Sequence, residues 1–424
     1  MGTTYYCNLG LDFVDRDGTD STTNVLTGPG GARAAEVGTG AATALAAGDT
    51  ILYYGEAMLD RWIELTCGKD VSAWTIGATV VDNNGGAEWH GKLCEVNVGS
   101  VNTHIYVQLD SGYVYGDVVI GSGINNTTDA DTTTLSAKAA PGVKLNDVSG
   151  VGPTGSIIRK GVNSSYVEDG TRATFNANSV ALYALSAGST RSYWVLANLR
   201  CTGATSHGFN LGANSYHFRV YNCCFDTNGS YGLNSDVQYG LFEQCVFANN
   251  ASYGLYFVAY SSIICCVSFG NGHAGYVISG SSIAYSIGHD NTLQSIQLGS
   301  WGIVLGCVVD GTDGGGDGVY MGPTDNVHVR FSRITNHSVA GKYGILSTNT
   351  HNDTQTEDYN VFHNNQAGDV HSAVQAGTHS YGGAAAHISD PADDGMEDVS
   401  ADNFNLKAGA LLRSVEIDLM ALVP

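Results

Sequence analysis

The chain has 424 residues, with 40 acidic and 18 basic side chains, and its net charge is −22 at pH 7. Nucleic acids and anionic membranes are bound through basic patches, so this charge argues against both and leaves neutral sugars, cations and other protein subunits as expected partners. No apolar run reaches the roughly 18 residues of a transmembrane helix, so we expect no membrane insertion. The 56 glycines against 6 prolines suit a chain with many tight corners.

The N-terminal residues Met1 to Tyr6 contain neither a basic segment nor an apolar one, so no signal peptide is visible. A protein made in the cytoplasm and released only by cell lysis would begin in this way. A chain whose leader has been removed would also look like this, and both alternatives stay open.

Residues 1–66 are expected to form an N-terminal cap and the first coil of the repeating structure described below. Residues 28–31 (GPGG) indicate a turn, and the Ala-rich residues 32–47 indicate a short helix that would cover an unpaired strand edge. The run from Asp15 to Asp20 (DRDGTD) has the alternating carboxylates of a calcium loop but lacks the later ligands and the terminal Glu of an EF-hand. We therefore expect a polar turn there, with calcium as the alternative.

Residues 67–150 differ in pattern from the rest of the chain. Alternating strands joined by Gly, Asn and Asp turns are expected at residues 74–81, 89–96, 104–109 and 113–120. The Asp-Ser-Gly turn at residues 110–112 favours a hairpin between the last two. This segment is predicted to be a small inserted antiparallel β-domain and the main place for contacts with other subunits.

The stretch from Trp194 to about Asn365 repeats itself. Residues 221–233 align with residues 243–255 at a constant offset of 22 residues, and a looser third copy follows. A fixed period of this size is typical of a solenoid. The apolar positions are short runs of Val, Ile, Phe, Tyr and Cys broken by Gly and Asn, with no Leu framework, which favours a parallel β-helix over a leucine-rich repeat. We assign residues 151–390 to this β-helix and residues 391–424 to a closing segment.

Equivalent positions of such coils stack at the inter-strand spacing of about 4.8 Å. An inward column of reduced, packed thiols is therefore expected at Cys201, Cys223, Cys245, Cys266 and Cys307. A stack of aromatic rings is expected beside it at Phe225, Phe247 and Phe269. A corner in the left-handed conformation, which Asn tolerates, is expected at Asn228, Asn250 and Asn271.

The repeat resembles that of the right-handed parallel β-helix proteins of the pectate-lyase-like superfold, which include phage tailspikes and adhesins. The resemblance is carried by Asn-Val-Phe-His-Asn-Asn at residues 360–365, by the opening residues 3–7 and the Ala-rich run up to residue 51, and by residues 402–411. That last segment is similar to the tail that often closes such proteins, with Ala410 and Leu411 in place of its Ser-Pro. The resemblance implies an all-β, right-handed β-helix and implies function only weakly.

The carboxylates best placed for catalysis are Asp310, Asp313 and Asp317, in the Gly-rich segment DGTDGGGD at residues 310–317. A hydrolase on this fold needs two carboxylates about 5 to 10 Å apart. A lyase needs an Arg or Lys base, often with calcium. The alternative, which we favour, is an extended corner with hydrated carboxylates. The chain has no HExxH or CxxC motif, so no metal site or cofactor is predicted.

We predict a structural or adhesin-type β-helix subunit of a phage virion or related extracellular assembly. It is expected to self-associate, as a homotrimer, and to contact other virion or surface-assembly proteins. Glycan binding is part of this hypothesis, because 23 Tyr and 5 Trp could line a flank that stacks on sugar rings, as Tyr231 and Tyr253 would. The alternative is a polysaccharide lyase or glycoside hydrolase acting on a surface glycan. Whether the chain is an enzyme stays open, and the lack of a convincing catalytic set argues against enzymatic activity.

Overall fold

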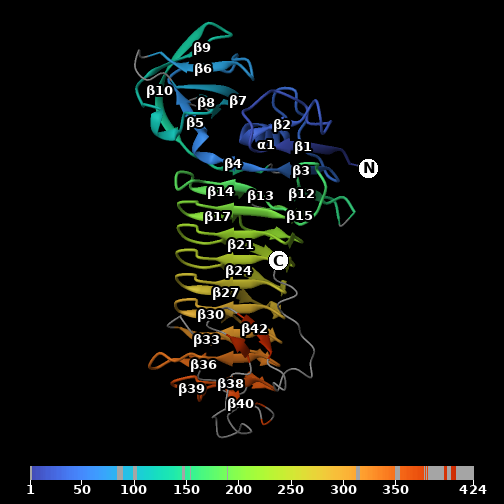
Figure 1. Cartoon of the computed structure of the whole chain (residues 1–424), viewed down its shortest axis with the longest axis vertical. Helices are drawn as coiled ribbons and strands as arrows, with labels where there is room; N and C mark the ends of the chain where they lie inside the picture. Colours follow the sequence, from blue (N-terminus) through green and yellow to red (C-terminus); the bar gives the residue numbers. More distant parts are fainter. Residues whose placement is uncertain are drawn as a thin grey trace. The chain divides into compact units, whose positions relative to one another are not determined.

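The computed structural model describes residues 2–83, 89–98, 103–145, 149–152, 154–188, 190–311, 316–348, 354–376, 378, 380, 396–398 and 403–406. These residues form an all-β protein with a single α-helix, α1 (Gly28–Val37) (Figure 1). The chain divides into two compact units, Met1–Gly212 and Ala213–Pro424. No helix of the described part is long and apolar enough to cross a membrane.

The second unit is a parallel β-helix built from three sheets (Figure 1). Sheet 1 contains β19 (Arg219–Tyr221), β22 (Leu241–Glu243), β25 (Ser262–Ile264), β28 (Ser282–Ala284), β31 (Ile303–Leu305), β34 (Val327–Arg330), β37 (Gln355–Asp358) and β40 (Gln375–Ala376). Sheet 2 contains β20 (Cys224–Asp226), β23 (Val246–Ala248), β26 (Val267–Phe269), β29 (Ile287–His289), β32 (Val308–Asp310), β35 (Arg333–Thr335) and β38 (Val361–His363). Sheet 3 contains β21 (Leu233–Gln238), β24 (Leu255–Ala259), β27 (Ala274–Ser279), β30 (Gln294–Leu298), β33 (Asp317–Met321), β36 (Tyr343–Ser347) and β39 (Gly368–Val370), with β18 (Ser215–Tyr216) paired to β21.

Each strand pairs in parallel with its equivalent one coil on, so a side chain stacks on the side chain at the same position. One inward column of sheet 1 is fully buried and consists of Val220, Phe242, Ile263, Ile283, Val304 and Val329. The coils average about 24 residues, not the 22 expected from the first two copies. The difference comes from the corners, since the connection from sheet 2 to sheet 3 lengthens from residues 290–293 to residues 336–342.

Left-handed residues turn the chain at each corner of a coil. The corner between sheets 3 and 1 uses His217, Tyr239, Tyr260, Gly280, Trp301 and Asn326, all with φ between 50° and 62°. The corner between sheets 1 and 2 uses Asn222, Gln244, Cys265, Tyr285, Gly306, Phe331 and Tyr359. The corner between sheets 2 and 3 uses Thr227, Asn249, Gly270, Asp290, Asn336 and Asn364. Most of these residues are not glycine, so hydrogen bonds to the next coil hold them in a conformation that is otherwise disfavoured.

The asparagines expected at a left-handed corner lie one residue after it, and that expectation was wrong. Asn228, Asn250, Asn271 and Asn291 point inward and form what we call the inner Asn column. The backbone N–H and the Nδ2 group of Asn250 both donate to Oδ1 of Asn271, at 3.1 and 2.9 Å, and Asn228 donates to Asn250 in the same way. These side chains are at most 3% exposed. Each amide therefore satisfies buried backbone groups that would otherwise lack partners.

The thiol column is confirmed at Cys223, Cys245, Cys266 and Cys307, which are buried and unpaired by disulfides. Serines complete it, because Cys266 N–H donates to Ser286 Oγ and Cys307 N–H donates to Ser332 Oγ. Cys201 does not belong to this position. It lies inside strand β16 (Leu199–Thr202) of the first unit, opposite Phe175, whereas Cys223 comes directly before its strand.

The predicted stack of phenylalanine rings is confirmed for Phe225 and Phe247 but is wrong for Phe269. The rings of Phe225 and Phe247 stack at 5.6 Å between centroids. The strand equivalent of Phe247 one coil on is Ser268, and Phe269 lies opposite Ala248. Since neighbouring strand positions point to opposite faces, Phe269 is turned outward and stacks on His289 at 5.0 Å.

The first unit combines short parallel sheets with a closed antiparallel barrel (Figure 1). One parallel sheet contains β2 (Leu26–Thr27), β1 (Thr4–Asn8), β3 (Thr50–Tyr54), β12 (Ile157–Gly161) and β15 (Trp194–Ala197). A second contains β4 (Glu56–Met58), β13 (Ala173–Asn176) and β16. A third contains β11 (Val143–Lys144), β14 (Tyr183–Ala187) and β17 (His207–Leu211). The barrel order is β10 (Asp131–Ala139), β5 (Trp62–Cys67), β8 (Thr103–Leu109), β7 (His90–Val98), β6 (Thr79–Asp82) and β9 (Gly123–Asn126). The 3-10 turn η1 (Leu59–Arg61) directly precedes β5, and a second 3-10 turn, η2 (Tyr115–Asp117), follows β8. The second unit also contains the antiparallel pair β41 (Met396–Asp398) and β42 (Asn403–Leu406).

The barrel confirms the inserted antiparallel domain, although one of its expected strands was wrong. Residues 113–120 contain η2 instead of a strand, and β8 pairs with β5 and β7. The Asp117 carboxylate accepts a hydrogen bond from the Val114 N–H at 2.8 Å and closes this short turn. The barrel core is apolar and includes the fully buried Trp89, Leu93 and Val107.

Helix α1 starts earlier and ends sooner than the Ala-rich segment suggested. Residues 28–31, expected as a turn, are its first turn, because Pro29 needs no N–H partner at this position. Gly38 ends it in the left-handed conformation, with φ 72°. Two buried ion pairs fix α1 within the first unit. Arg33 Nε lies 2.8 Å from Glu95 in β7, and Glu36 lies 2.6 Å from Arg159 in β12.

We expect the substitution Asn250→Ala to lower the free energy of unfolding by about 3 kcal/mol, because it leaves several buried backbone and amide groups without partners. The matched control is Asn249→Gly, at the exposed left-handed position next to it, which should change stability by less than about 1 kcal/mol. Urea unfolding followed by circular dichroism measures both. Equal losses for the two variants would contradict the assigned role of the inner Asn column.

Candidate functional site

Two of the three predicted catalytic carboxylates lie in the described part of the chain, and both are buried. Asp310 ends β32 and is 1% exposed. Its Oδ1 accepts hydrogen bonds from Thr335 Oγ1 at 3.0 Å and from Asn336 Nδ2 at 2.7 Å. Asp317 begins β33, is 5% exposed, and accepts from the Tyr343 N–H at 2.8 Å, with Lys342 Nζ at 3.3 Å. Both carboxylates bind the next coil.

His337 lies close to both carboxylates and takes the position that Asn residues occupy in the inner Asn column. Like them it is the second residue after its sheet 2 strand, and its N–H donates to Asn365 Oδ1 at 3.3 Å. Its Nδ1 lies 3.0 Å from the Gly316 carbonyl oxygen, so Nδ1 carries the proton. Its Nε2 is buried and has no hydrogen-bond partner among the residues that the structure describes.

Two glycines make room for the His337 ring. A Cβ at Gly311 would lie 2.5 Å from Nδ1, and a Cβ at Gly318 would lie 2.7 Å from Nε2. Burial lowers the pKa of His337 below its ordinary 6.5, while the Gly316 carbonyl, Asp310 and Asp317 act in the opposite direction. The imidazole is therefore neutral at pH 7. The Gly-rich sequence of this segment serves to fit the ring.

This buried cluster can hold the coils together, but it offers no carboxylate to a polymer in solution. Asp313 lies outside the described residues, so its place relative to Asp310 and Asp317 stays a prediction. Among the residues that the structure describes, no group of three His, Cys, Asp or Glu side chains could hold a metal ion. In the run from Asp15 to Asp20, the Asp17 and Asp20 carboxylates accept hydrogen bonds from their own loop, as in a polar turn.

Exposed aromatic rings distinguish the surface of the second unit. We call Tyr239, Tyr260 and Trp301 the aromatic corner column, since all three occupy the left-handed corner between sheets 3 and 1. They are 54%, 58% and 63% exposed. The rings of Tyr239 and Tyr260 stack at 5.8 Å, and His217 stacks on Tyr239 at 5.6 Å. The N–H groups of Tyr239, Tyr260 and Trp301 donate to the carbonyl groups of Ala259, Ser279 and Asp325 on the next coil, which fixes their register.

A second aromatic group lies at the start of the sheet 3 strands. Tyr231 stacks on Tyr256 at 4.6 Å, and Tyr253 lies 4.9 Å from both Tyr256 and His273. Burial raises the pKa of Tyr231 and Tyr253, and the neighbouring Tyr256 adds to this. Irregular pairing of β24 places Phe257 in a left-handed conformation with 41% of its surface exposed. Two neighbouring positions of β24, Tyr256 and Phe257, therefore carry aromatic rings.

A third group follows the corner between sheets 1 and 2. Tyr285, Phe331 and Tyr359 are 40–43% exposed, and Phe331 stacks on Tyr359 at 5.1 Å. These rings are less exposed than the aromatic corner column. They provide a matched set at a different corner of the same coils.

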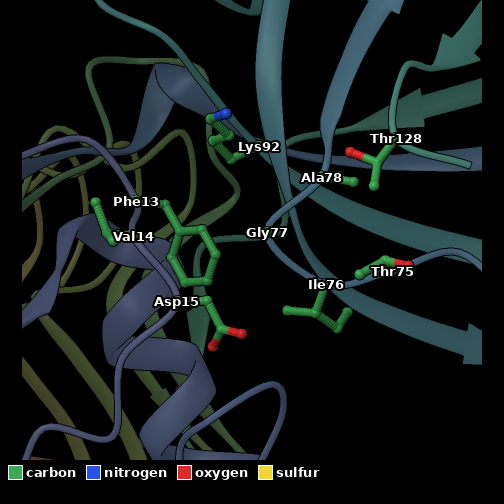
Figure 2. Close-up of a pocket in the computed structure, with 9 residues that line it drawn as sticks. All are labelled: Phe13, Val14, Asp15, Thr75, Ile76, Gly77, Ala78, Lys92 and Thr128. Carbon is green, nitrogen blue, oxygen red and sulfur yellow. The ribbon is translucent and has the colours of Figure 1, made fainter.

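The first unit contains a pocket of about 470 Å³ between the N-terminal segment and the barrel (Figure 2). It is lined by Phe13, Val14, Asp15, Thr75, Ile76, Gly77, Ala78, Lys92 and Thr128. The Asp15 carboxylate accepts a hydrogen bond from the Ala41 N–H at 2.7 Å, and Lys92 donates to Thr79 Oγ1 at 2.7 Å. Its two charged groups are thus already engaged in holding the surrounding loops.

The sequence suggested an aromatic flank and named Tyr231 and Tyr253 for it, but it did not identify the more exposed rings of the aromatic corner column. Tyr231 and Tyr253 are equivalent in the repeat and do touch, at 5.2 Å. Tyr239 and Trp301 escaped notice because their surroundings share no motif. The signal that could have found them is position, since each follows a sheet 3 strand where the chain must turn.

We expect stability to fall as the pH falls below about 6.5, because unfolded His337 takes up a proton that the folded imidazole resists. Each proton contributes a slope of at most about 1.4 kcal/mol per pH unit. The substitution His337→Asn, which restores the usual residue of the column, should flatten the profile between pH 7 and 5. Urea unfolding at several pH values measures it. Parallel profiles for the two proteins would refute a neutral, buried His337.

No protein-family model matches the sequence, and no curated protein matches it. Among solved structures, the chain is similar to the pectate lyase Pel9A, with 12% identity over 97% of this chain and 90% of that one and a TM-score of 0.53. An alginate lyase from Paenibacillus sp. str. FPU-7 shows 13% identity over 55% and 90% of the two chains, with a TM-score of 0.39. The periplasmic alginate epimerase AlgG shows 14% identity over 62% and 65%, with a TM-score of 0.37. At this identity the likeness to Pel9A concerns the fold alone. With its stacked parallel coils, the chain is a parallel β-helix protein, and it shares this fold with Pel9A.

Proposed function

We propose that this protein is an adhesin-type β-helix subunit that binds a neutral glycan without cleaving it. The observation that carries the proposal is the aromatic corner column, whose three rings are more than half exposed. Large exposed apolar rings that recur at one surface position mark interaction sites. Aromatic faces also stack on the C–H faces of sugar rings, so such a column suits a polysaccharide.

The charge of the chain supports a neutral ligand. A net charge of −22 repels polyuronates such as pectate or alginate. The sheet 1 surface next to the column carries the ion pair Arg219–Glu243, at 2.7 Å, whose charges offset each other. Uncharged sugars, with hydroxyl groups and apolar ring faces, are not repelled by this negative charge and need no charged partner on the surface.

Glycan binding is tested by affinity electrophoresis in gels that contain soluble starch, galactomannan, xyloglucan or polygalacturonate. We expect at least one neutral polysaccharide to retard the native protein. The double variant Tyr239→Ala/Tyr260→Ala should bind about tenfold more weakly, since aromatic stacking contributes about 0.5–1.5 kcal/mol per contact. The matched control is Phe331→Ala/Tyr359→Ala, which should bind as the native protein does. Retardation by polygalacturonate alone, or by no polysaccharide, would refute the proposal.

We further propose that the subunit self-associates as a homotrimer within a virion or another extracellular assembly. Support comes from the first unit, where Val114, Val119 and Ile120 around η2 are 42%, 57% and 45% exposed. Three apolar side chains exposed within one short segment suit a protein contact.

Light scattering of the purified protein should give three times the monomer mass. The double variant Val119→Asp/Ile120→Asp should lower that mass to the monomer value, because it places charge where apolar contact is expected. The exposed Leu182, changed to Asp, is the control and should leave the trimer intact. A native protein that is monomeric would refute the assembly proposal and leave the glycan proposal standing.

The second candidate function is a polysaccharide lyase or glycoside hydrolase, and it rests on residues 310–317. The burial of Asp310 and Asp317 disfavours it, since a catalytic carboxylate must reach the bond that breaks. The double variant Asp313→Ala/Asp317→Ala decides the matter if any turnover is found. Loss of turnover with unchanged stability would favour the enzyme, and turnover that persists would exclude this set.

A further inference from the structure

We propose that the outer face of sheet 1 binds a second copy of this chain, with the two β-helices antiparallel. The face consists of the outward side chains of β22, β25, β28, β31 and β34, and we call it the sheet 1 face. The contact goes beyond the proposed glycan binding. It is also separate from the proposed trimer contact, which lies in the first unit.

Two columns of side chains form the sheet 1 face, one on each side of the fully buried column of this sheet. Neighbouring positions of a strand point to opposite faces, so both columns point outward. The first column consists of Leu241, Ser262, Ser282, Ile303 and His328, and the second consists of Glu243, Ile264, Ala284, Leu305 and Arg330. Ile303 and Arg330 are exposed, and the other eight side chains are partly exposed.

The three central coils of the sheet 1 face carry no charge. Their outward residues are serine, alanine, isoleucine and leucine. A chain with a net charge of −22 repels its own copies, and this repulsion is weakest where neither surface is charged. Ile264, Ala284 and Leu305 form an apolar strip along the centre, and removing such a strip from water is favourable. The centre of this face therefore suits a second copy of the chain.

Opposite charges lie at the two ends of the second column. Glu243 lies two coils before Ala284, and Arg330 lies two coils after it. Two copies related by a two-fold axis that passes through β28, along the strand direction, are antiparallel, and each column then faces itself in reverse order. Glu243 of each copy therefore faces Arg330 of the other, and Ile264 faces Leu305. The pairing brings two sets of opposite charges together.

The charges also decide between the antiparallel and the parallel arrangement. With the two-fold axis along the β-helix, the two columns would face each other at the same coil, so that Glu243 would meet Leu241 and Arg330 would meet His328. That arrangement leaves both charges without an opposite charge. In the antiparallel one, Arg219 of the same copy already holds the Glu243 carboxylate in place, at 2.7 Å, so little freedom is lost on pairing.

The size of the sheet 1 face indicates a weak contact. Five coils span about 20 Å at about 4.8 Å per coil, and a strand of three residues is about 10 Å wide. The rings of Tyr260, Trp301 and Tyr285 at its two edges enlarge it, but it stays below the roughly 800 Å² that each partner buries in a stable complex. Pairing therefore requires high protein concentration, as in a densely packed assembly. At micromolar concentration the aromatic corner column stays open to glycan.

The test is sedimentation equilibrium of the full chain that carries Val119→Asp/Ile120→Asp, so that the first unit contributes no association. Its mass should rise from the monomer toward the dimer between about 5 µM and about 0.5 mM, as expected of a small interface. Adding Ala284→Glu places like charges at the two-fold axis and should weaken pairing at least about tenfold. Gln297→Glu adds the same charge to an outward position of sheet 3 and should leave pairing within about twofold.

A mixing experiment separates the proposed contact from a loss of fold. In Glu243→Arg or in Arg330→Glu, two copies of the same variant face like charges at both ends, so each variant alone should pair at least about tenfold more weakly. A copy of one variant facing a copy of the other has opposite charges at both ends. An equal mixture should therefore pair within about threefold of the parent protein, which requires both variants to be folded.

Three results would each overturn the pairing of sheet 1 faces. They are a monomer mass up to about 0.5 mM, pairing that Ala284→Glu leaves intact, and a mixture that pairs no better than either charge variant alone. None of them bears on retardation by a polysaccharide or on the trimer mass, since both are measured on the native protein at micromolar concentration. Failure of the glycan proposal would likewise leave the predicted pairing unchanged.

Discussion

Every coil of the second unit must satisfy its buried polar groups with the coil that follows, and this requirement governs the rest of the structure. Parallel strands a few residues long leave their corners without sheet hydrogen bonds. The inner Asn column supplies them, with each amide bonded to the next at 2.8–2.9 Å. The left-handed residue before each Asn turns the chain so that the amide points inward. In-register stacking follows, because a shift of one residue would bury the wrong side chain.

The same corner geometry separates the structural residues from the surface that we propose binds glycan. A side chain at the left-handed position points to solvent, as Tyr239 and Trp301 do, whereas the side chain one position later can be buried. His337 occupies a buried position of this kind, and Asp310 and Asp317 beside it serve the next coil. The carboxylates that resembled a catalytic set thus bind the protein itself. The exposed rings of the aromatic corner column, which the sequence analysis did not single out, are the ones open to a ligand.

The sequence was sufficient to predict the fold but not the conformations of the residues at the corners of the coils. A constant offset between two copies predicts stacked coils, and the inserted antiparallel domain follows from alternating strands. Assigning Asn228 to the left-handed position failed because Asn tolerates that conformation and also suits a buried ladder, and periodicity does not tell the two apart. Phe269 was misplaced because one residue fewer in its coil moves it to the other strand face. Burial of Asp310 depends on Thr335 and Asn336, which only coil register brings close.

The central claim is that the protein holds a neutral polysaccharide and leaves it whole. The most direct test incubates the purified chain with the polysaccharide that retards it and then measures the molar mass distribution of the recovered polysaccharide by size-exclusion chromatography with light scattering. The account predicts a distribution identical to that of polysaccharide incubated without protein. A shift to shorter chains that grows with time would contradict it and identify the protein as a polysaccharide-degrading enzyme.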